Sequence, residues 1–325
     1  MGKYWKSIGT ALGCFLIVLV LNFLLPRLLP GDPIAYLTGF SEEEMTPAQY
    51  EAYADALHLN DSLLRQFGYY LKSLLDGTLG YSFKKDAVVS ELISDRLGVT
   101  LQISLPAVLL STVLGLVWGL RCGVKKDSVF DRLSSGAMIV LNAIPAFVMG
   151  LVFIILFCFK HRWLPYTGLN GPDAVPGSFG YFLDRLRHLL LPVLTLTLAT
   201  LPSRFLLMRS TARKAADEKY VLYARERGLS PRRIRYTYVL PNIVQPFLTM
   251  VGMSVSLCVG GSLIVENLFS ISGMGKLLTD AVYSLDYPLM QGILFVSTLL
   301  MAAAVIVTEV CCILIDPKLR LGGAK

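Results

Sequence analysis

The sequence predicts an all-α polytopic membrane protein with six transmembrane helices, both termini inside (N-in/C-in), and a small helical extracytoplasmic loop region. Hydrophobic residues make up 54% of the 325 residues and charged residues only 16%, which is the balance of a membrane protein and not of a soluble one. Six apolar segments also reach the roughly 20 residues that a bilayer core requires. The positions of Lys and Arg between these segments then give the orientation.

The predicted spans are Ile8–Leu29, Val99–Leu120, Gly136–Phe159, Leu189–Met208, Ile243–Val265 and Leu289–Ile315. No small-residue cleavage site follows the first span, and Pro26 and Arg27 stand there instead, so we expect a retained anchor and not a signal peptide. Five prolines lie inside the other spans, where neighbouring helices can satisfy the freed carbonyl groups. We expect packing kinks at these positions, with a functional hinge as the alternative: Pro106, Pro145, Pro192, Pro202 and Pro246.

Basic residues concentrate in the connections that an inside N-terminus places in the cytoplasm. The long loop Gly31–Gly98 contains more carboxylates than basic residues, and the loop Asn267–Pro288 contains only Lys276 as a basic residue. The net charge of +7 follows from this arrangement and from attraction to anionic lipid. It therefore indicates the lipid bilayer as a partner and no nucleic acid. The six cysteines show no metal-ligand spacing and act as small apolar residues.

Four regions are predicted along the chain. They are an N-terminal anchor helix (1–30), an extracytoplasmic loop region (31–98), a transmembrane core (99–315) with a cytoplasmic loop (209–242), and a cytoplasmic tail (316–325). In the loop region, Ser41 or Thr46 can cap a helix that starts at Pro47. Apolar residues recur at helical spacing over Leu63–Leu75, and the segment Asp76–Phe83 breaks that helix.

The most unusual polar segment is the basic loop, residues 217–241, which has the sequence DEKYVLYARERGLSPRRIRYTYVLP. Asp217 can cap a first helix, and Gly228 can end it in the left-handed conformation that a residue with a Cβ atom resists. Ser230 then caps a second helix, which begins with a proline and ends near Pro241. Two short helices at a bend on one membrane face indicate a docking element, whereas a solvated basic face is the simpler alternative.

Few polar side chains occur within the predicted spans. Arg204 and Glu309 lie near the cytoplasmic ends of their spans, so we expect both side chains to snorkel to the surface. Other polar residues are either packing contacts or candidates for lining a pathway. The pathway candidates are Gln102, Asn142, Ser254 and Ser256.

The chain carries no motif for an energy source or for catalysis. The segment Ser270–Leu277 has the sequence SISGMGKL, which partly matches the phosphate-loop pattern G-x-x-x-x-G-K-[ST]. Serine replaces the first glycine of that pattern at position 270, and leucine replaces the hydroxyl residue at position 277. No buried relay of Asp, Glu and His crosses the bilayer midplane, as a proton- or sodium-driven transporter usually requires. We therefore predict no catalytic residue, no metal site and no cofactor bound by this chain. A membrane pore with an elaborate docking loop implies a subunit driven by a partner.

The basic loop resembles the EAA loop of ABC importer permeases, whose pattern is E-A-A-x-x-x-G followed after nine residues by I-x-L-P. Ala224, Gly228, Leu240 and Pro241 fit that spacing, whereas Leu222, Tyr223 and Tyr238 depart from the general pattern. The variant is similar to that of the dipeptide, oligopeptide and nickel branch. Other segments similar to that branch follow in order along the chain: Leu29–Pro33, Asp76–Phe83, Asn142–Phe147, Arg187–Leu196, Ser272–Gly292 and Ile315–Gly322.

This resemblance implies the permease subunit of an ATP-driven importer in a bacterial or archaeal cytoplasmic membrane. The implied partners are a second homologous permease subunit, giving a heterodimer, two cytoplasmic ATP-binding subunits that hold ATP and Mg, and an extracytoplasmic solute-binding protein. The resemblance also implies that the basic loop couples the permease to the ATPase subunits. The implied coupling residues are Asp217, Tyr220, Ala224, Arg225, Gly228, Leu229, Leu240 and Pro241.

Di- and oligopeptides are the expected substrates of the translocation pathway. Nickel or a metal chelate is the alternative, because the same branch carries both, although no His, Cys and Asp cluster indicates a path for a bare metal ion. From other classes, a membrane scaffold or an intramembrane enzyme are the alternatives. A scaffold would not need the basic loop. An intramembrane enzyme would need a nucleophile or metal motif, and the sequence shows neither.

Overall fold

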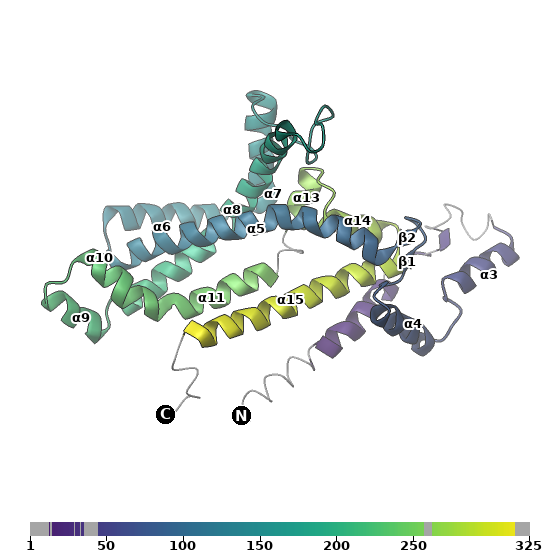
Figure 1. Ribbon diagram of the computed structural model, residues 1–325, viewed down its shortest axis with the longest axis horizontal. Helices are drawn as coiled ribbons and strands as arrows, with labels where there is room; N and C mark the ends of the chain where they lie inside the picture. Colours follow the sequence, from purple (N-terminus) through teal and green to yellow (C-terminus); the bar gives the residue numbers. More distant parts are fainter. Residues whose placement is uncertain are drawn as a thin grey trace. The chain divides into compact units, whose positions relative to one another are not determined.

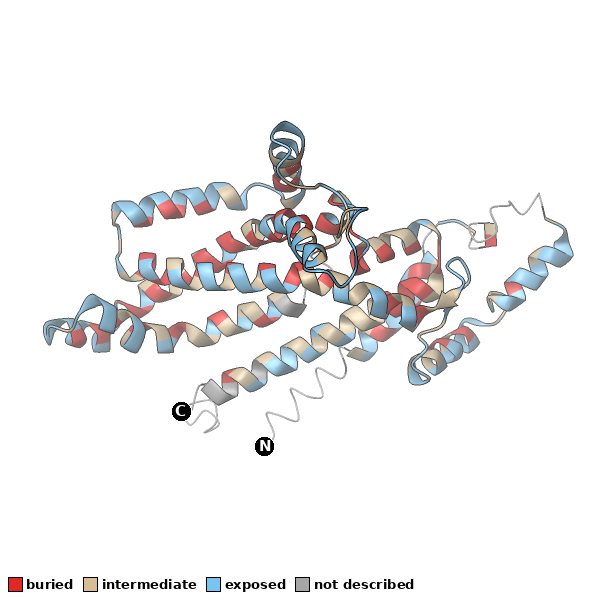
Figure 2. Cartoon of the chain, turned by 45° about the horizontal axis from the view of Figure 1, so that its top comes forward, coloured by how far each residue is buried: buried red, intermediate tan, exposed pale blue. Residues whose placement is uncertain are grey.

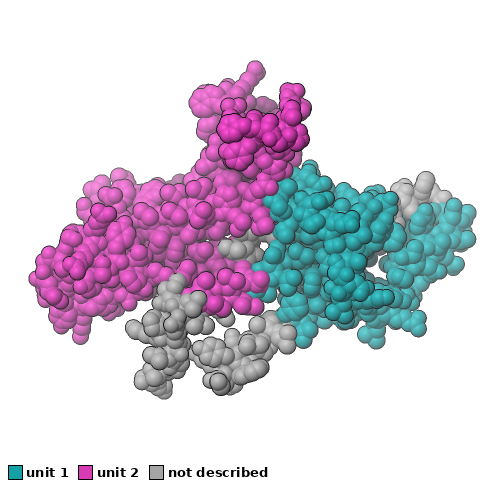
Figure 3. Space-filling model, in the orientation of Figure 1, with its two compact units in different colours: residues 1–99, 272–302 teal, residues 100–271, 303–325 magenta. Residues whose placement is uncertain are grey.

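The computed structural model describes residues 13, 15–28, 30–32, 34–35, 45–256 and 262–315. The chain divides into two compact units, which are coloured separately in Figure 3. Unit 1 comprises Met1–Val99 and Ser272–Ala302, and unit 2 comprises Thr100–Ile271 and Ala303–Lys325.

Unit 1 is mainly helical and contains one small β-hairpin (Figure 1). Its first described element is the apolar helix Phe15–Leu28, which ends in the 3-10 turn η1 (Leu25–Leu28). The other elements are α3 (Pro47–Ala56), α4 (Leu63–Leu75), β1 (Tyr81–Ser82), β2 (Ala87–Val88), the first turns of α5 (Val89–Val124), α14 (Met274–Tyr283) and the first half of α15 (Tyr287–Ile315).

The helix starts in the loop region follow the capping signals of the sequence. Thr46 is the N-cap of α3: its side chain accepts a hydrogen bond from the backbone of Gln49, and the Gln49 side chain bonds back to the backbone of Thr46. Pro47 occupies the first helical position, as predicted, because its missing N–H has no intrahelical role there. The predicted helix Leu63–Leu75 is confirmed as α4. Ser41, the other capping candidate, lies outside the described residues.

The helix break predicted at Asp76–Phe83 is present, and a short β-hairpin that the sequence did not predict begins within it. β1 and β2 form an antiparallel pair in which Tyr81 opposes Val88 and Ser82 opposes Ala87. Gly80 precedes this hairpin with a φ of +97°, a conformation that breaks a helix and that glycine adopts at little cost. Ser82 also donates a hydrogen bond of 2.5 Å to the buried carboxyl group of Asp286, so the hairpin is tied to the start of α15.

Unit 2 contains the remaining long helices, along which buried and exposed residues alternate (Figure 2). Its elements after the main part of α5 are α6 (Val129–Asn142), α7 (Ala146–Phe153), the π-helical η3 (Ile154–Lys160), α8 (Phe179–Ala215), α9 (Lys219–Glu226), α10 (Pro231–Arg233), the π-helical η4 (Ile234–Val239), α11 (Leu240–Ser256), α13 (Leu263–Leu268) and the end of α15.

Close packing of α5 on α8 depends on three glycines spaced four residues apart, Gly115, Gly119 and Gly123. A Cβ atom added at any of them would come within 2.6–2.7 Å of an atom of α8. Such small-residue spacing lets the backbones of membrane helices approach each other closely. Gly115 lies against Arg204 and Gly119 lies against Met208, both of which have long side chains. The packing therefore also fixes the positions of these two side chains.

The structure corrects the expected snorkelling of Arg204. Its side chain is 1% exposed, and Nη1 donates a hydrogen bond of 2.5 Å to Ser111 Oγ on α5. The guanidinium is held inside unit 2 because Gly115 brings the two helices together at the level of Arg204. The side chain of Glu309, the other residue expected to snorkel, lies outside the described part of the chain.

Three described helices are long and apolar enough to cross a membrane, namely Val89–Val124, Phe179–Ala215 and Tyr287–Cys312. They contain the second, fourth and most of the sixth predicted spans. The fifth predicted span, Ile243–Val265, includes α11 but also residues 257–261, which lie outside the described residues. Six spans and the N-in/C-in orientation therefore stay predictions.

The third predicted span, Gly136–Phe159, is wrong as a single helix. α6 ends at Asn142 and α7 begins at Ala146, and the two helices meet at an angle of 97°. The break follows from Pro145, which has an extended ψ of 145° and whose ring disfavours a helical conformation in the preceding residue. The other four prolines expected to kink helices do lie inside helices: Pro106, Pro192, Pro202 and Pro246.

Candidate functional site

The basic loop forms a compact helical structure between α8 and α11 (Figure 1). Its first helix, α9, has eight residues, Lys219–Glu226. An isolated helix of this length is marginal in water, so its stability has to come from packing. The contacts that stabilise it are apolar on one side, whereas the other side is exposed.

α9 ends in a Schellman motif centred on Gly228. The N–H of Leu229 donates to the carbonyl of Ala224 at 3.2 Å, and the N–H of Gly228 donates to the carbonyl of Arg225 at 2.9 Å. The φ of Gly228 is +72°, and a Cβ atom added there meets no atom within 4 Å. The predicted left-handed glycine is therefore confirmed, and the reason for the glycine is its backbone conformation and not a lack of space.

The buried face of α9 consists of Val221 and Ala224, which are 0% and 3% exposed. They belong to a hydrophobic cluster with residues at the end of α8, on η4 and on α11. Members of this cluster are Leu120, Met208, Ala212, Ala215, Ala216, Val221, Ala224, Ile234, Val239, Ile243 and Phe247, with Leu229 and Leu240 packed against it. The cluster makes α9 a firm extension of two long helices.

The opposite face of α9 exposes three large apolar or aromatic side chains. Tyr220, Leu222 and Tyr223 are 38%, 43% and 62% exposed. We call these three residues the outer face of α9. Burial raises the pKa of Tyr220 above its ordinary value, and the nearby Glu218 adds to this, so the phenol stays neutral and can donate a hydrogen bond. Exposed aromatic side chains on a firmly held helix are typical of a protein-binding surface.

The predicted capping role of Asp217 is wrong. The N-cap of α9 is Glu218, whose side chain makes no capping hydrogen bond. The N–H of Asp217 still bonds to the carbonyl of Lys214 in the turn that follows α8. The Asp217 carboxylate instead pairs with Lys126 of the α5–α6 connection, and this lysine holds the pKa of Asp217 below its ordinary value.

The second helix of the basic loop begins as predicted but does not end as predicted. Ser230 caps it by accepting a hydrogen bond from the backbone N–H of Arg233. The helix does not end near Pro241, however, because α10, η4 and α11 follow one another without a break. In the π-helical η4 the N–H of Leu240 bonds to the carbonyl of Arg235, five residues back, and the wider turn accommodates the following proline.

The sequence prediction missed a charge ladder in which two arginines of α8 pair with Asp127 of the α5–α6 connection and with Asp131 of α6. Arg209 makes two hydrogen bonds, of 2.5 and 2.9 Å, to the carboxylate of Asp131, which is 1% exposed. Arg213 pairs with Asp127 at 3.0 Å. The signal was present in the spacing, since two carboxylates and two arginines each lie four residues apart, one helical turn. These bonds fix the end of α8, on which α9 packs.

The other predicted coupling residues lie around this structure. Arg225 is exposed on α9, Leu229 and Leu240 are half-buried against the hydrophobic cluster, and Pro241 is exposed at the start of α11. The structure therefore gathers the eight predicted coupling residues in one segment. Their coupling role stays a prediction at this point.

The four pathway candidates lie on three helices, α5, α6 and α11. Gln102 on α5 accepts a hydrogen bond of 2.7 Å from Arg185, and Asn142 is exposed at the end of α6. The Ser254 hydroxyl donates to the carbonyl of Met250 within α11. The side chain of Ser256 lies outside the described residues. A pathway lined by these residues stays a prediction.

Within the described residues, no group of three or more His, Cys, Asp or Glu side chains could hold a metal ion. The four described cysteines, Cys122, Cys158, Cys311 and Cys312, are free thiols. The expectation that this chain binds no cofactor stays untested.

Comparison with known proteins identifies the family. A family model described as "Binding-protein-dependent transport system inner membrane component" matches residues 111–321, more than half of the chain and all of the basic loop. The chain is 30% identical to the probable peptide ABC transporter permease protein y4tP of Sinorhizobium fredii, over 98% of this chain and 100% of that protein. It is 33% identical to the di/tripeptide transport system permease protein DppB of Pseudomonas aeruginosa, and 27% identical to the dipeptide transport system permease protein DppB of Escherichia coli, each over 97% of both chains. The chain therefore belongs to the family of inner-membrane components of binding-protein-dependent transport systems.

Proposed function

We propose that this chain is the permease subunit of an ATP-driven importer and that it forms the translocation pathway for di- and oligopeptides. The names of the relatives support peptides as the substrate class, since y4tP and both DppB proteins are described as peptide permeases. The likeness to them extends over nearly the whole chain. We further propose six spans with both termini in the cytoplasm, which places the basic loop on the cytoplasmic side.

The observation that carries the proposal is the two-sided packing of α9. The outer face of α9 suits a groove on a cytoplasmic ATP-binding subunit, in the manner of an amphipathic helix docked by its apolar side chains. The buried face, Val221 and Ala224, packs on α8 and on the continuous helix that leads into α11. A movement of the ATP-binding subunit would therefore be passed to both long helices as a rigid-body displacement.

The partners follow from this assignment. We propose two cytoplasmic ATP-binding subunits, which hold ATP and Mg, a second homologous permease subunit, and an extracytoplasmic solute-binding protein. The family description supports the dependence on a binding protein. In this scheme residues 31–98 face the extracytoplasmic side, residues 99–315 form the permease core with its coupling loop 209–242, and residues 316–325 form a cytoplasmic tail.

The proposal is tested by transport in proteoliposomes that contain the chain, its copurifying subunits and its solute-binding protein. We expect ATP-dependent uptake of a radiolabelled dipeptide and no uptake of radiolabelled nickel, free or chelated. Uptake of nickel without uptake of peptide would make the chain a nickel permease. Uptake of neither, from a complex that hydrolyses ATP, would remove the peptide assignment.

A further inference from the structure

The helix α7 and the π-helical η3 that continues it form an apolar segment that the proposed coupling role does not explain. From Ala146 to Phe159 this segment contains no charged side chain. Large apolar side chains recur every four residues on its exposed side, at Leu151, Ile155 and Phe159. In a protein of the inner membrane, a continuous exposed apolar face of this kind indicates contact with lipid.

The turn that follows this apolar face, Phe159–Tyr166, has a different character. Its sequence is FKHRWLPY, and we call it the aromatic-basic turn. Lys160, Arg162, Trp163 and Tyr166 are all exposed. Tryptophan and tyrosine beside basic residues at the end of an apolar helix are typical of the headgroup level of a bilayer, where one end of each ring is apolar and the other is wet.

Backbone bonds and ring contacts hold the aromatic-basic turn in one conformation. The N–H of Trp163 donates to the carbonyl of Phe157 at 2.8 Å. The Trp163 ring stacks on His161 with ring centroids 4.7 Å apart, and it also contacts the ring of Phe157 at 6.0 Å. The rings of Phe159 and Tyr166 lie 5.3 Å apart. The turn is therefore a preformed surface, and a ligand that binds it does not have to order it first.

Arg162 has a backbone conformation that a side chain resists. Its φ is +55°, in the left-handed region where glycine is the residue that costs least. A strained residue of this kind is a reason to look for a function at that position. The presence of arginine at a position suited to glycine indicates that the guanidinium group has a role.

In the part of the chain that the structure describes, neither Lys160 nor Arg162 is paired with a carboxylate. The ion pairs of unit 2 there involve other basic side chains, namely Lys126, His188, Arg209 and Arg213. The sequence also contains no Asp or Glu between Asp131 and Asp173. The aromatic-basic turn thus presents two positive charges that the neighbouring sequence does not neutralise.

We propose that the aromatic-basic turn is a binding site for the headgroup of an anionic phospholipid. The guanidinium of Arg162 and the ammonium of Lys160 bind the negatively charged oxygens of the headgroup. Trp163 and Tyr166 lie at the boundary between headgroup and acyl chains. The acyl chains pack on the exposed apolar face of α7 and η3.

A lipid fits this surface better than an acidic protein segment does, because the basic turn is continuous with an apolar face that has the character of a lipid contact. With the proposed orientation the turn lies on the extracytoplasmic side. The positive-inside pattern does not explain two basic residues there, whereas a headgroup site does.

The test is quenching of Trp163 fluorescence by lipids that are brominated high on their acyl chains. The full chain with its copurifying subunits is placed in phosphatidylcholine nanodiscs with a rising mole fraction of brominated phosphatidylglycerol or brominated phosphatidylcholine. The difference between the wild type and Trp163→Phe gives the signal of Trp163 and removes that of all other tryptophans. We expect brominated phosphatidylglycerol to reach half-maximal quenching at a lower mole fraction than brominated phosphatidylcholine, by about fivefold or more.

Lys160→Gln and Arg162→Gln should each raise the mole fraction of phosphatidylglycerol that gives half-maximal quenching about fivefold, the contribution of one basic residue near an anionic surface. Each variant is measured with and without Trp163→Phe. Lys125→Gln and Arg132→Gln make the same changes at exposed residues near the start of α6 and are the matched controls. They should not change the quenching of Trp163, and the thermal unfolding midpoint should stay the same in all four variants because the side chains are exposed.

Three results would overturn the proposal. Equal quenching of the wild type by both lipids would mean that the turn touches the bilayer without a headgroup site. A preference for phosphatidylglycerol that persists in Lys160→Gln and in Arg162→Gln would place the anionic lipid elsewhere. Quenching by neither lipid would place the turn outside the bilayer, and protection of Trp163 from acrylamide by the solute-binding protein would then identify a protein as its partner. The proposed function does not depend on any of these results.

Discussion

Gly228 gives the basic loop a left-handed residue that ends α9 and turns the chain towards α10. Because an added Cβ atom would meet no neighbour, the effect of a substitution there depends on φ alone. Asparagine tolerates this conformation better than alanine does, and proline cannot adopt it. Gly228 is therefore suited to a graded test of the loop.

We expect Gly228→Asn, Gly228→Ala and Gly228→Pro to weaken ATP-dependent uptake in that order. Alanine costs about 1 kcal/mol in the left-handed region. Proline costs about 3 kcal/mol and also removes the N–H that bonds to Arg225. Uptake by proteoliposomes checks the order, and equal uptake by the glycine and proline forms would contradict a coupling role for the loop.

Asp286 is a second residue whose environment has a measurable consequence. Burial raises its pKa, although the hydrogen bonds from Ser82 and Leu289 and the charge of Lys85 act in the opposite direction. Because folding raises this pKa, the folded chain binds the proton more tightly than the unfolded chain does. The resulting stabilisation is complete below about pH 4, the ordinary pKa of an aspartate, and is lost as the pH rises through the folded-state pKa.

The stability of unit 1 should therefore decrease from about pH 4 towards neutral pH. Asp286→Asn should remove the contribution of Asp286 to this decrease, because the amide does not titrate. Hydrogen exchange of the first turns of α15, measured across this pH range, checks the prediction. Asp280→Asn changes a half-exposed carboxyl group and is the matched control. A pH dependence that is the same in both variants would show that Asp286 is not its source.

The residues that the sequence predicted correctly are those whose partners lie nearby in the chain. Thr46, Gly228 and Ser230 act on backbone groups within five residues of themselves, so capping rules are sufficient for them. Asp217 was assigned wrongly because its partner, Lys126, lies 91 residues away.

At the scale of elements, α9 combines a buried face and an outer face within eight residues. Substitutions on the two faces should therefore have different effects. The buried face determines whether the loop folds, and the outer face determines what it binds. The difference allows folding and docking to be measured separately.

Leu222→Ala should weaken the association of the chain with its ATP-binding subunits about tenfold without changing its thermal unfolding midpoint. Leu133→Ala makes the same change at a side chain of α6 that is 70% exposed, compared with 43% for Leu222. Affinity measured by titration of purified ATP-binding subunits into nanodiscs should not change for this control. Equal affinity of both variants and the wild type would show that the outer face does not dock.

The charge ladder between α8 and the carboxylates Asp127 and Asp131 makes a separate prediction about stability. Asp131→Asn removes charge from a buried double hydrogen bond and should lower the free energy of unfolding by about 2 kcal/mol. Asp127→Asn changes the exposed pair with Arg213 and should cost at most about 1 kcal/mol. Thermal unfolding in detergent compares the two, and equal losses would mean that burial of Asp131 contributes nothing.

Helix positions were predictable where apolar runs are long, and helix breaks were less so. Composition predicted the apolar helices that contain Val99–Leu120 and Leu189–Met208. The break at Pro145 was missed because four other prolines are accommodated inside helices, and the difference depends on neighbouring contacts. The continuation of α10 into α11 was missed because a π-helical turn has no reliable sequence signal.

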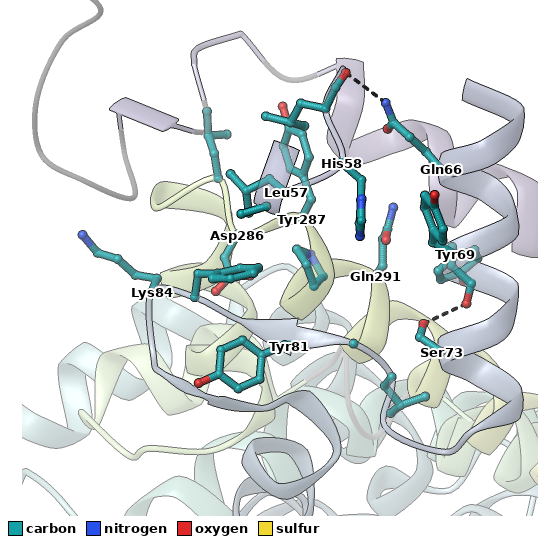
Figure 4. A pocket seen from close by; sticks show the side chains of 18 of the residues that line it. Leu57, His58, Gln66, Tyr69, Ser73, Tyr81, Lys84, Asp286, Tyr287 and Gln291 are labelled. Carbon is teal, nitrogen blue, oxygen red and sulfur yellow. Dashed lines mark hydrogen bonds between the residues drawn. The ribbon is translucent and has the colours of Figure 1, made fainter. Parts of the chain in front are cut away.

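At the scale of the whole molecule, the chain is a multi-pass protein of the bacterial inner membrane and a component of a binding-protein-dependent transport system. The family could be predicted because several short segments resemble one branch in the same order. A pocket in unit 1 (Figure 4) could not be predicted, since residues from before position 30 and after position 280 line it.

In the proposed function, α9 transmits the energy of ATP hydrolysis to a peptide permease. The most direct measurement is ATP-dependent uptake of a radiolabelled dipeptide by proteoliposomes whose permease carries Leu222→Ala together with Tyr223→Ala. We expect uptake to fall to the level without ATP while the thermal unfolding midpoint of the chain is unchanged, because both side chains are exposed. Uptake equal to that of the wild type would contradict it.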